Sequence, residues 1–183
     1  MDMFEKRKKR AFEIDRSNIG RIDKRIKGLV DAINRKDNYF TTSSCSGRIM
    51  VIKRQGKKTN SKILFCSHEK VTDSQEIEKV IVTGGDVWLL FNACILHVCC
   101  RTIEDAMQLF SLAKKAGFKR QGIISTKNTV MVEIMGTDHM EIILADDEGT
   151  YYTKEGLDRY LYYANKKFEK NLQKIKAFED ILK

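Results

Sequence analysis

The run of small, hydroxyl-bearing residues at positions 40–48 is the part of this sequence best suited to bind a ligand. It reads Phe-Thr-Thr-Ser-Ser-Cys-Ser-Gly-Arg and leads directly into the apolar segment Ile49–Ile52. Small side chains let a ligand approach the backbone, and Gly47 permits turn geometries that other residues avoid. Arg48 adds a fixed fork of donors that suits a carboxylate or a phosphate. We therefore expect a ligand-binding turn here.

Three other side chains able to do chemistry lie in or beside apolar segments. His97 is enclosed by the sequence Ile-Leu-His-Val-Cys-Cys, where a histidine must find a partner or carry a desolvation cost. His68 follows a short apolar segment, and Trp88 sits in Val-Trp-Leu-Leu. Taken singly, a hydrogen-bonded core histidine and a packed core tryptophan explain them as well. Their joint presence with the serine-rich run favours a site in which a histidine moves protons.

The sequence lacks the residue patterns of several familiar sites. The sequence contains neither the phosphate-binding pattern G-x-x-x-x-G-K-[ST] nor a strand followed by G-x-G-x-x-G, and it has no C-x-x-C pair. The gap between Cys45 and Arg48 is too short for a phosphatase loop, and we interpret Cys45 as a small thiol and not as a nucleophile. The residue types of Cys66, His68, His97 and Cys100 would suit a metal, but we expect none.

The pattern of apolar residues predicts helices and strands in alternation. Apolar spacing predicts a helix over 18–36, and Thr102 and Thr153 stand where two later helices should begin, the first of them ending at Gly117. The first of the remaining expected elements are a hairpin of strands 49–52 and 63–66 and a helix from 72–75 to about 80. Strands 87–91 and 94–100 should follow, with Asn92-Ala93 between them as a bulge or a tight turn, and then strands 121–125, 130–135 and 140–144. This order predicts an α+β fold with a mixed, largely antiparallel sheet and packed helices. The length of 183 residues suits one domain, residues 1–183, or two small lobes that share a core.

The formal net charge of +9 is unevenly distributed. Residues 1–36 hold twelve Lys and Arg against six acidic residues, and a second basic group lies in the hairpin connection, comprising Lys53, Arg54, Lys57, Lys58 and Lys62. Such regional excess suits a polyanion such as RNA, although a merely solvated basic surface gives the same composition. The N-terminal residues are charged and the longest apolar run is too short to cross a bilayer, so we expect a cytoplasmic protein without membrane attachment.

These residues resemble the motifs of the tRNA wybutosine-synthesising protein 3 family. The matching segments are Thr41–Arg48, Trp88-Leu89, Leu96-His97-Val98-x-Cys100, Ala116–Phe118, Gly122-Ile123 and Ala164-Asn165, and the similarity extends from about Phe12 to Ile181. The resemblance implies a methyltransferase that uses S-adenosylmethionine and acts on the N4 ring nitrogen of a tricyclic guanosine at position 37, beside the anticodon of phenylalanine tRNA. It also implies a fold other than the doubly wound Rossmann methyltransferase fold.

With this resemblance, the candidate residues acquire expected roles. The expected catalytic residues are His97, Ser43 and Ser44, with His97 accepting or relaying the proton lost from the ring. Residues expected to hold the methyl donor are Cys45, Ser46, Gly47, Arg48 and Trp88, and those expected to bind the tRNA are His68, Lys53, Arg54, Lys57 and Lys58. The alternative is a non-catalytic RNA-binding module in which the serine-rich run binds an anion and the histidine is structural. The sequence sets no oligomeric state.

Overall fold

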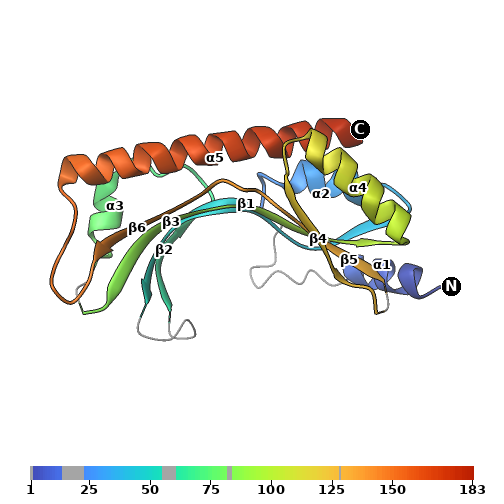
Figure 1. The fold of residues 1–183 in the computed structure, drawn as a ribbon, viewed down its shortest axis with the longest axis horizontal. Helices are drawn as coiled ribbons and strands as arrows, with labels where there is room; N and C mark the ends of the chain where they lie inside the picture. Colours follow the sequence, from blue (N-terminus) through green and yellow to red (C-terminus); the bar gives the residue numbers. More distant parts are fainter. Residues whose placement is uncertain (1, 14–22, 55–60, 82–83, 128) are drawn as a thin grey trace. The chain divides into compact units, whose positions relative to one another are not determined.

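The computed structural model describes residues 2–13, 23–54, 61–81, 84–127 and 129–183. The strands there form a six-stranded sheet in the order β2-β1-β3-β5-β4, with β6 also paired to β3 (Figure 1). The helices are α1 (Met3–Glu13), α2 (Lys27–Asn34), α3 (Ser74–Glu78), α4 (Ile103–Lys115) and α5 (Lys154–Leu182). The strands are β1 (Tyr39–Arg54), β2 (Lys62–Ser67), β3 (Asp86–Cys100), β4 (Arg120–Ser125), β5 (Val130–Met135) and β6 (His139–Ala145). The α+β class, with antiparallel pairing, is confirmed.

Local sequence signals set most element ends as expected. Thr102 caps α4, and its hydroxyl and the Asp105 carboxylate satisfy each other's backbone amides in a capping box. Gly117 follows α4 with φ of 94°, a conformation that favours glycine. The hydroxyl of Thr153 accepts a hydrogen bond from the Gly156 amide at the start of α5. These threonine caps and the glycine stop were therefore correct predictions.

Three expected elements differ in the structure. The helix expected over 18–36 begins only at Lys27, after a turn at 24–26, and residues 18–22 lie outside the described part. The helix expected from 72–75 to about 80 is α3, which begins at Ser74 and ends at Glu78. Its N-cap is Asp73, whose carboxylate accepts a hydrogen bond from the Gln75 amide. The two strands expected at 87–91 and 94–100 are one strand, β3. Along one face of β3, the buried residues have odd numbers before Asn92-Ala93 and even numbers after it. One extra residue in a continuous strand has this effect, so a bulge and not a tight turn lies there.

The chain divides into two compact units, each described here by itself. Unit 1 comprises Met1–Ser46, Cys94–Thr137 and Asn171–Lys183, and unit 2 comprises Gly47–Ala93 and Asp138–Lys170. The strands β1 and β3 and the helix α5 contribute residues to both units. None of the described helices is long and apolar enough to cross a membrane.

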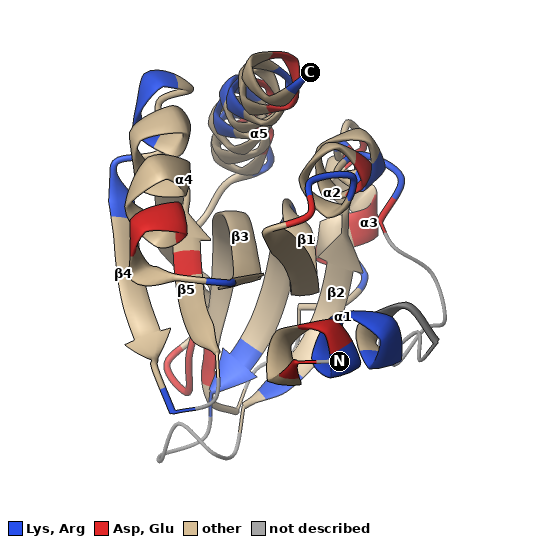
Figure 2. Cartoon of the chain, turned by 90° about the vertical axis from the view of Figure 1, so that its right-hand side faces the viewer, with Lys and Arg blue, Asp and Glu red and all other residues tan. Residues whose placement is uncertain are grey.

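Unit 1 buries apolar side chains on both faces of its strands. On one face, α2, α4 and the end of α5 cover alternate residues of β3 and β5, including Leu96, Val98 and Val132. On the other face, Phe4 of α1 packs against Phe40 of β1 and Cys99 of β3. Figure 2 shows α1 on the opposite side of the strands from α2 and α4.

Unit 2 is built on the other halves of the shared elements. Phe91 of β3 meets Phe168 of α5 edge to face, with ring centroids 6.2 Å apart. The Asn165 side chain exchanges two hydrogen bonds with the backbone of Val71, which fixes the segment before α3 to α5. On the opposite side of the strands, Met50, Ile52, Leu90 and Trp88 form a separate apolar cluster.

A buried asparagine of α5 joins two strands of unit 1. The Asn171 amide group donates to the Ser46 carbonyl at 2.5 Å, and its carbonyl accepts from the Cys94 amide at 2.8 Å. Asn171 is fully buried, as is Ser46. Each of these backbone groups would otherwise be an unsatisfied polar group in the interior.

We predict that Asn171→Leu lowers the free energy of unfolding by about 2 to 4 kcal/mol, because it leaves two buried backbone groups without partners. Urea unfolding followed by circular dichroism measures this change. Gln173→Leu, at an exposed position two residues further along α5, is the matched control and should change stability by less than about 0.5 kcal/mol. A loss for Asn171→Leu no larger than that of the control would contradict the structural role of Asn171.

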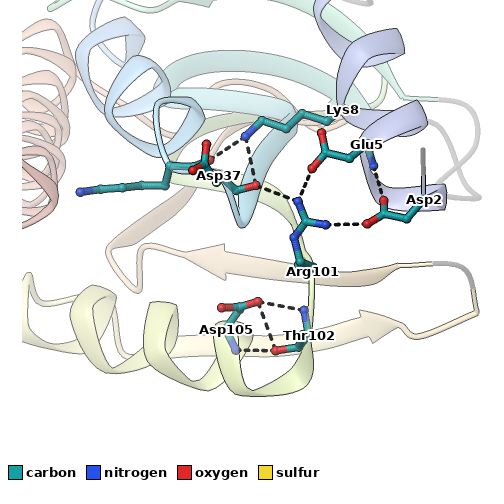
Figure 3. Close-up of polar contacts among 8 residues, drawn as sticks. Asp2, Glu5, Lys8, Asp37, Arg101, Thr102 and Asp105 are labelled. Atoms are coloured by element: carbon teal, nitrogen blue, oxygen red, sulfur yellow. Dashed lines mark hydrogen bonds and ion pairs between the residues drawn. The ribbon is translucent and has the colours of Figure 1, made fainter.

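Arg101, just after β3, holds α1 on unit 1 (Figure 3). Its guanidinium pairs with Asp2 at 2.6 Å and with Glu5, and it lies over the Phe4 ring with its central carbon 4.5 Å from the centroid. It also contacts the Asp37 carbonyl. The Glu5 amide, and then Arg101, hold the pKa of the Asp2 carboxyl below its ordinary value of 3.8. The contribution of Asp2 to the free energy of unfolding is therefore complete above pH 3.8 and is lost as the pH falls below it.

We expect Arg101→Gln to loosen α1 without unfolding the rest of unit 1. The two ion pairs are partly exposed, so their loss should speed amide hydrogen exchange in Met3–Ala11 by roughly three- to tenfold. Exchange in α4 should be unchanged. Arg120→Gln, at an exposed position on β4, is the control. Unaltered exchange in α1 of the Arg101 variant would show that the helix is held by other contacts.

Candidate functional site

The serine-rich run is part of a strand and not a turn, which corrects the expectation from the sequence. Residues 40–48 lie inside β1, a strand of 16 residues. Threonines fit an extended chain well, and this preference prevails over the turn tendency of the small residues. Gly47 alone departs from ordinary strand geometry, with φ of 103°. The boundary between the two units falls between Ser46 and Gly47.

The register of β3 and β5 determines which side chains share the α1 face of unit 1. Cys99 is paired with Met131, and both belong to the cluster beneath Phe4 of α1. Two residues away along each of these strands, His97 is paired with Glu133. Because residues two apart share a face, His97 and Glu133 lie on this same side of the sheet.

A continuous set of hydrogen bonds links three side chains on that face. The Ser43 hydroxyl lies 2.6 Å from Nδ1 of His97, and Nε2 of His97 lies 2.9 Å from a carboxylate oxygen of Glu133. The Ser43 side chain is exposed, and the His97 and Glu133 side chains are 28% and 32% exposed. The three strands β1, β3 and β5 thus bring together a hydroxyl, an imidazole and a carboxylate that solvent or a ligand can reach.

The structure places two predicted catalytic residues together and adds one that the sequence reasoning missed. His97 and Ser43 were expected to act in one site, and they are in direct contact. Glu133 was not singled out. Its signal was a lone carboxylate in the middle of the apolar strand Val130–Met135. Such a residue needs a partner or a ligand, but only the strand register shows that the partner is His97.

The other members of the serine-rich run in unit 1 have different surroundings. Ser44 and Cys45 are half-buried in β1. Ser46 is fully buried, and both its hydroxyl and its backbone amide donate to the Asp23 carboxylate. Since its carbonyl accepts from Asn171, the polar groups of Ser46 are engaged inside unit 1.

The buried cysteines of unit 1 are poorly suited to act as nucleophiles. Burial raises the pKa of the Cys94, Cys99 and Cys100 thiols, in the case of Cys100 to about 12. A thiol with a raised pKa holds its proton at neutral pH, whereas the reactive form is the thiolate. These thiols therefore act as small apolar side chains.

In unit 2, Trp88 lies in a charged setting. The Arg54 guanidinium lies over the Trp88 ring, 5.0 Å from its centroid, and pairs with Glu141 of β6 at 2.5 Å. The indole N–H of Trp88 is buried, and among the described residues it finds no hydrogen-bond partner. An aromatic face with an unused buried donor is a reasonable place for a planar heterocycle with acceptor atoms.

The remaining expected binding residues lie mostly in unit 2. Arg48 and Lys53 are half-buried in β1, and His68 follows β2. Lys57 and Lys58 lie outside the described residues, so their expected role has no structural context. The described members of the basic hairpin connection are Lys53 and Arg54 at the end of β1 and Lys62 at the start of β2.

Comparison with known proteins finds solved structures and sequences that are similar to this chain over most of its length. A solved structure of a Pyrococcus horikoshii protein superposes with a TM-score of 0.90 and 36% identity, covering 98% of this chain and 96% of that chain. The tRNA(Phe) 7-((3-amino-3-carboxypropyl)-4-demethylwyosine(37)-N(4))-methyltransferase 1 of Pyrococcus horikoshii is 37% identical over 164 residues, 87% of this chain and 84% of its own length. The tRNA wybutosine-synthesizing protein 3 homolog of Xenopus laevis is 34% identical over 178 residues, covering 94% and 71%.

The family relationship extends over nearly the whole chain. The family model described as Methyltransferase TYW3 matches residues 5–183, a range that includes β1, β3, β5 and the three linked side chains. The resemblance seen in the sequence motifs is therefore confirmed, and the chain belongs to the TYW3 family of methyltransferases.

Proposed function

We propose that this protein transfers a methyl group from S-adenosylmethionine to the N4 ring nitrogen of the tricyclic guanosine derivative at position 37 of phenylalanine tRNA, a step in wyosine biosynthesis. The support is membership of the TYW3 methyltransferase family and the methyltransferase activity for which two relatives, 36 and 37% identical, are named. With tRNA as its substrate, we propose that the protein works in the cytoplasm.

The observation that carries the mechanism is the contact between Ser43 and His97. At 2.6 Å, the hydroxyl and Nδ1 are at the separation of a strong hydrogen bond. Methylation of a ring nitrogen in a neutral tricyclic base releases a proton from the ring system. A hydroxyl that is already hydrogen-bonded to an imidazole can accept that proton while passing its own to the histidine.

The partial exposure of this pair suits a large substrate. Ser43 is exposed on β1, so the base of a nucleotide can reach its oxygen, while the 28% exposed His97 keeps a route for the proton to solvent. A site for a whole tRNA must be open, because the substrate base is presented on a loop. Ser44, next to Ser43 on β1, is proposed to contact the base as well.

The residues around Trp88 fit a methyl donor that carries an adenine ring. Bound S-adenosylmethionine supplies an electrophilic methyl group. In unit 2, the Trp88 ring would offer a stacking surface once the Arg54 guanidinium over it moves aside, and its buried indole N–H has no partner among the described residues. Arg48 is proposed to hold the donor's carboxylate, since a guanidinium pairs with such a group through two hydrogen bonds. The expected donor contacts of Cys45 and Gly47 stay predictions.

Basic residues are proposed to hold the tRNA backbone. Figure 2 shows Lys and Arg on α1 and along α5. In unit 2, Lys53 and Arg54 end β1, and Lys57 and Lys58 follow them in the sequence. We also keep His68 as a proposed tRNA contact. Phosphate contacts of this kind position the substrate and weaken as salt is added.

We predict that Ser43→Ala and His97→Ala each slow methyl transfer by about 100-fold or more, because proton transfer by a positioned side chain typically contributes this much. Single-turnover transfer of labelled methyl groups to tRNA lacking the modification measures the rate. His139→Ala, which changes an exposed histidine of β6, is the matched control and should leave the rate within about twofold.

Two results would contradict the proposal. Rates near wild-type for both Ser43→Ala and His97→Ala would show that the proton leaves by another route. If the wild-type protein binds tRNA but neither binds the donor nor transfers a methyl group, the chain is a non-catalytic RNA-binding module. Family membership disfavours that second reading.

A further inference from the structure

We propose that Glu133 is a positioning residue that sets the tautomer of His97, so that Nδ1 faces Ser43 as the proton acceptor. The catalytic consequence rests on the function proposed above. The statement about the tautomer concerns the protein alone and is tested without substrate.

The strand register forces Glu133 toward His97. Val132 and Ile134 are buried on the helix-covered face of unit 1, so the residue between them projects to the opposite face. Glu133 is directly paired with His97 across β3 and β5. The two side chains meet at 2.9 Å, through a carboxylate oxygen and Nε2.

The donor and acceptor roles follow from the chemistry of a carboxylate. An ionised carboxylate only accepts hydrogen bonds, so Nε2 of His97 must carry the hydrogen that joins it to Glu133. A neutral imidazole carries one hydrogen, and Nδ1 is then an acceptor. The Ser43 hydroxyl, 2.6 Å away, must therefore donate to Nδ1. Its oxygen lone pairs remain available to take a proton from the substrate.

The neighbours of Glu133 leave this contact undisturbed. On β4, the residue paired with Glu133 is Gly122, which has no side chain, and a Cβ atom placed there would meet nothing within 4 Å. Two cations on the same side of unit 1 have their own partners, since Arg7 donates to Thr129 and Arg101 pairs with Asp2 and Glu5. Within the described part of the chain, the Glu133 carboxylate pairs with His97.

The same contact stabilises the charge that the reaction creates. When Ser43 takes the ring proton and passes its own proton to Nδ1, His97 becomes an imidazolium with hydrogens on both nitrogens. The Glu133 carboxylate lies against the Nε2 hydrogen and offsets this positive charge. The proton then leaves from His97 to solvent, and the starting state is restored.

The test combines nitrogen NMR with kinetics in Glu133→Gln. Gln keeps the size of Glu, but its amide can either donate to Nε2 or accept from it, so it no longer selects one tautomer. In the wild-type protein we expect the ring nitrogens of His97 to show the Nε2–H tautomer at a pH where the ring is neutral, and the variant should show a mixture. The chain has three histidines, so a His97 variant assigns the signals.

For methyl transfer, we expect Glu133→Gln to lower the single-turnover rate by about 10- to 100-fold with an unchanged half-saturating tRNA concentration. The thermal midpoint should stay close to wild-type, because a partly exposed ion pair contributes little to stability. Glu148→Gln, which removes an exposed carboxylate, is the matched control and should behave as wild-type.

An Nδ1–H tautomer in the wild-type protein overturns the proposal, as does a variant whose rate stays within twofold of wild-type. A wild-type protein without methyl-transfer activity would instead refute the proposed function, and the NMR result would still decide the tautomer.

Discussion

The antiparallel register of β3 and β5 is the constraint on which the candidate site depends. Leu96, Val98 and Val132 must be buried beneath the helices of unit 1, and this burial supplies the main stabilisation of the sheet. Because side chains alternate along a strand, His97 and Glu133 then have to face the other way. A shift of either strand by one residue would turn its polar group toward the core and its apolar residues away from it. Core packing and the geometry of the candidate site therefore follow from a single register.

The polar groups of unit 1 fall into two kinds that the structure treats differently. Asn171 and Ser46 are fully buried, and the hydrogen bonds of the Asn171 side chain join α5 to β1 and β3. These hydrogen bonds satisfy backbone groups in the interior. Ser43, His97 and Glu133 are partly exposed, and their mutual contacts contribute little to folding. That contrast favours a functional reason for the second set. It also makes the second set accessible to mutation without loss of the fold.

The sequence was a good guide to element types and a weaker one to their lengths and faces. The caps at Thr102 and Thr153 and the stop at Gly117 are local signals, and they were read correctly. The run 40–48 was taken for a turn because small residues are common there, yet strand pairing along β1 decides its conformation. Such pairing involves residues far away in the sequence, so the nine residues of the segment alone do not reveal it.

The site could be predicted only in part for the same reason. His97 and Ser43 stood out as polar groups in apolar or unusual surroundings, and they proved to be in contact. Glu133 lies 36 residues from His97 in the sequence, so only the register between β3 and β5 joins them.

The most direct test of the account is the mass of nucleoside 37 in phenylalanine tRNA taken from a strain that lacks this protein. After incubation with the purified protein and S-adenosylmethionine, the account predicts the gain of one methyl group on the ring nitrogen of the tricyclic base. An unmodified nucleoside, under conditions where the tRNA is bound, would contradict it.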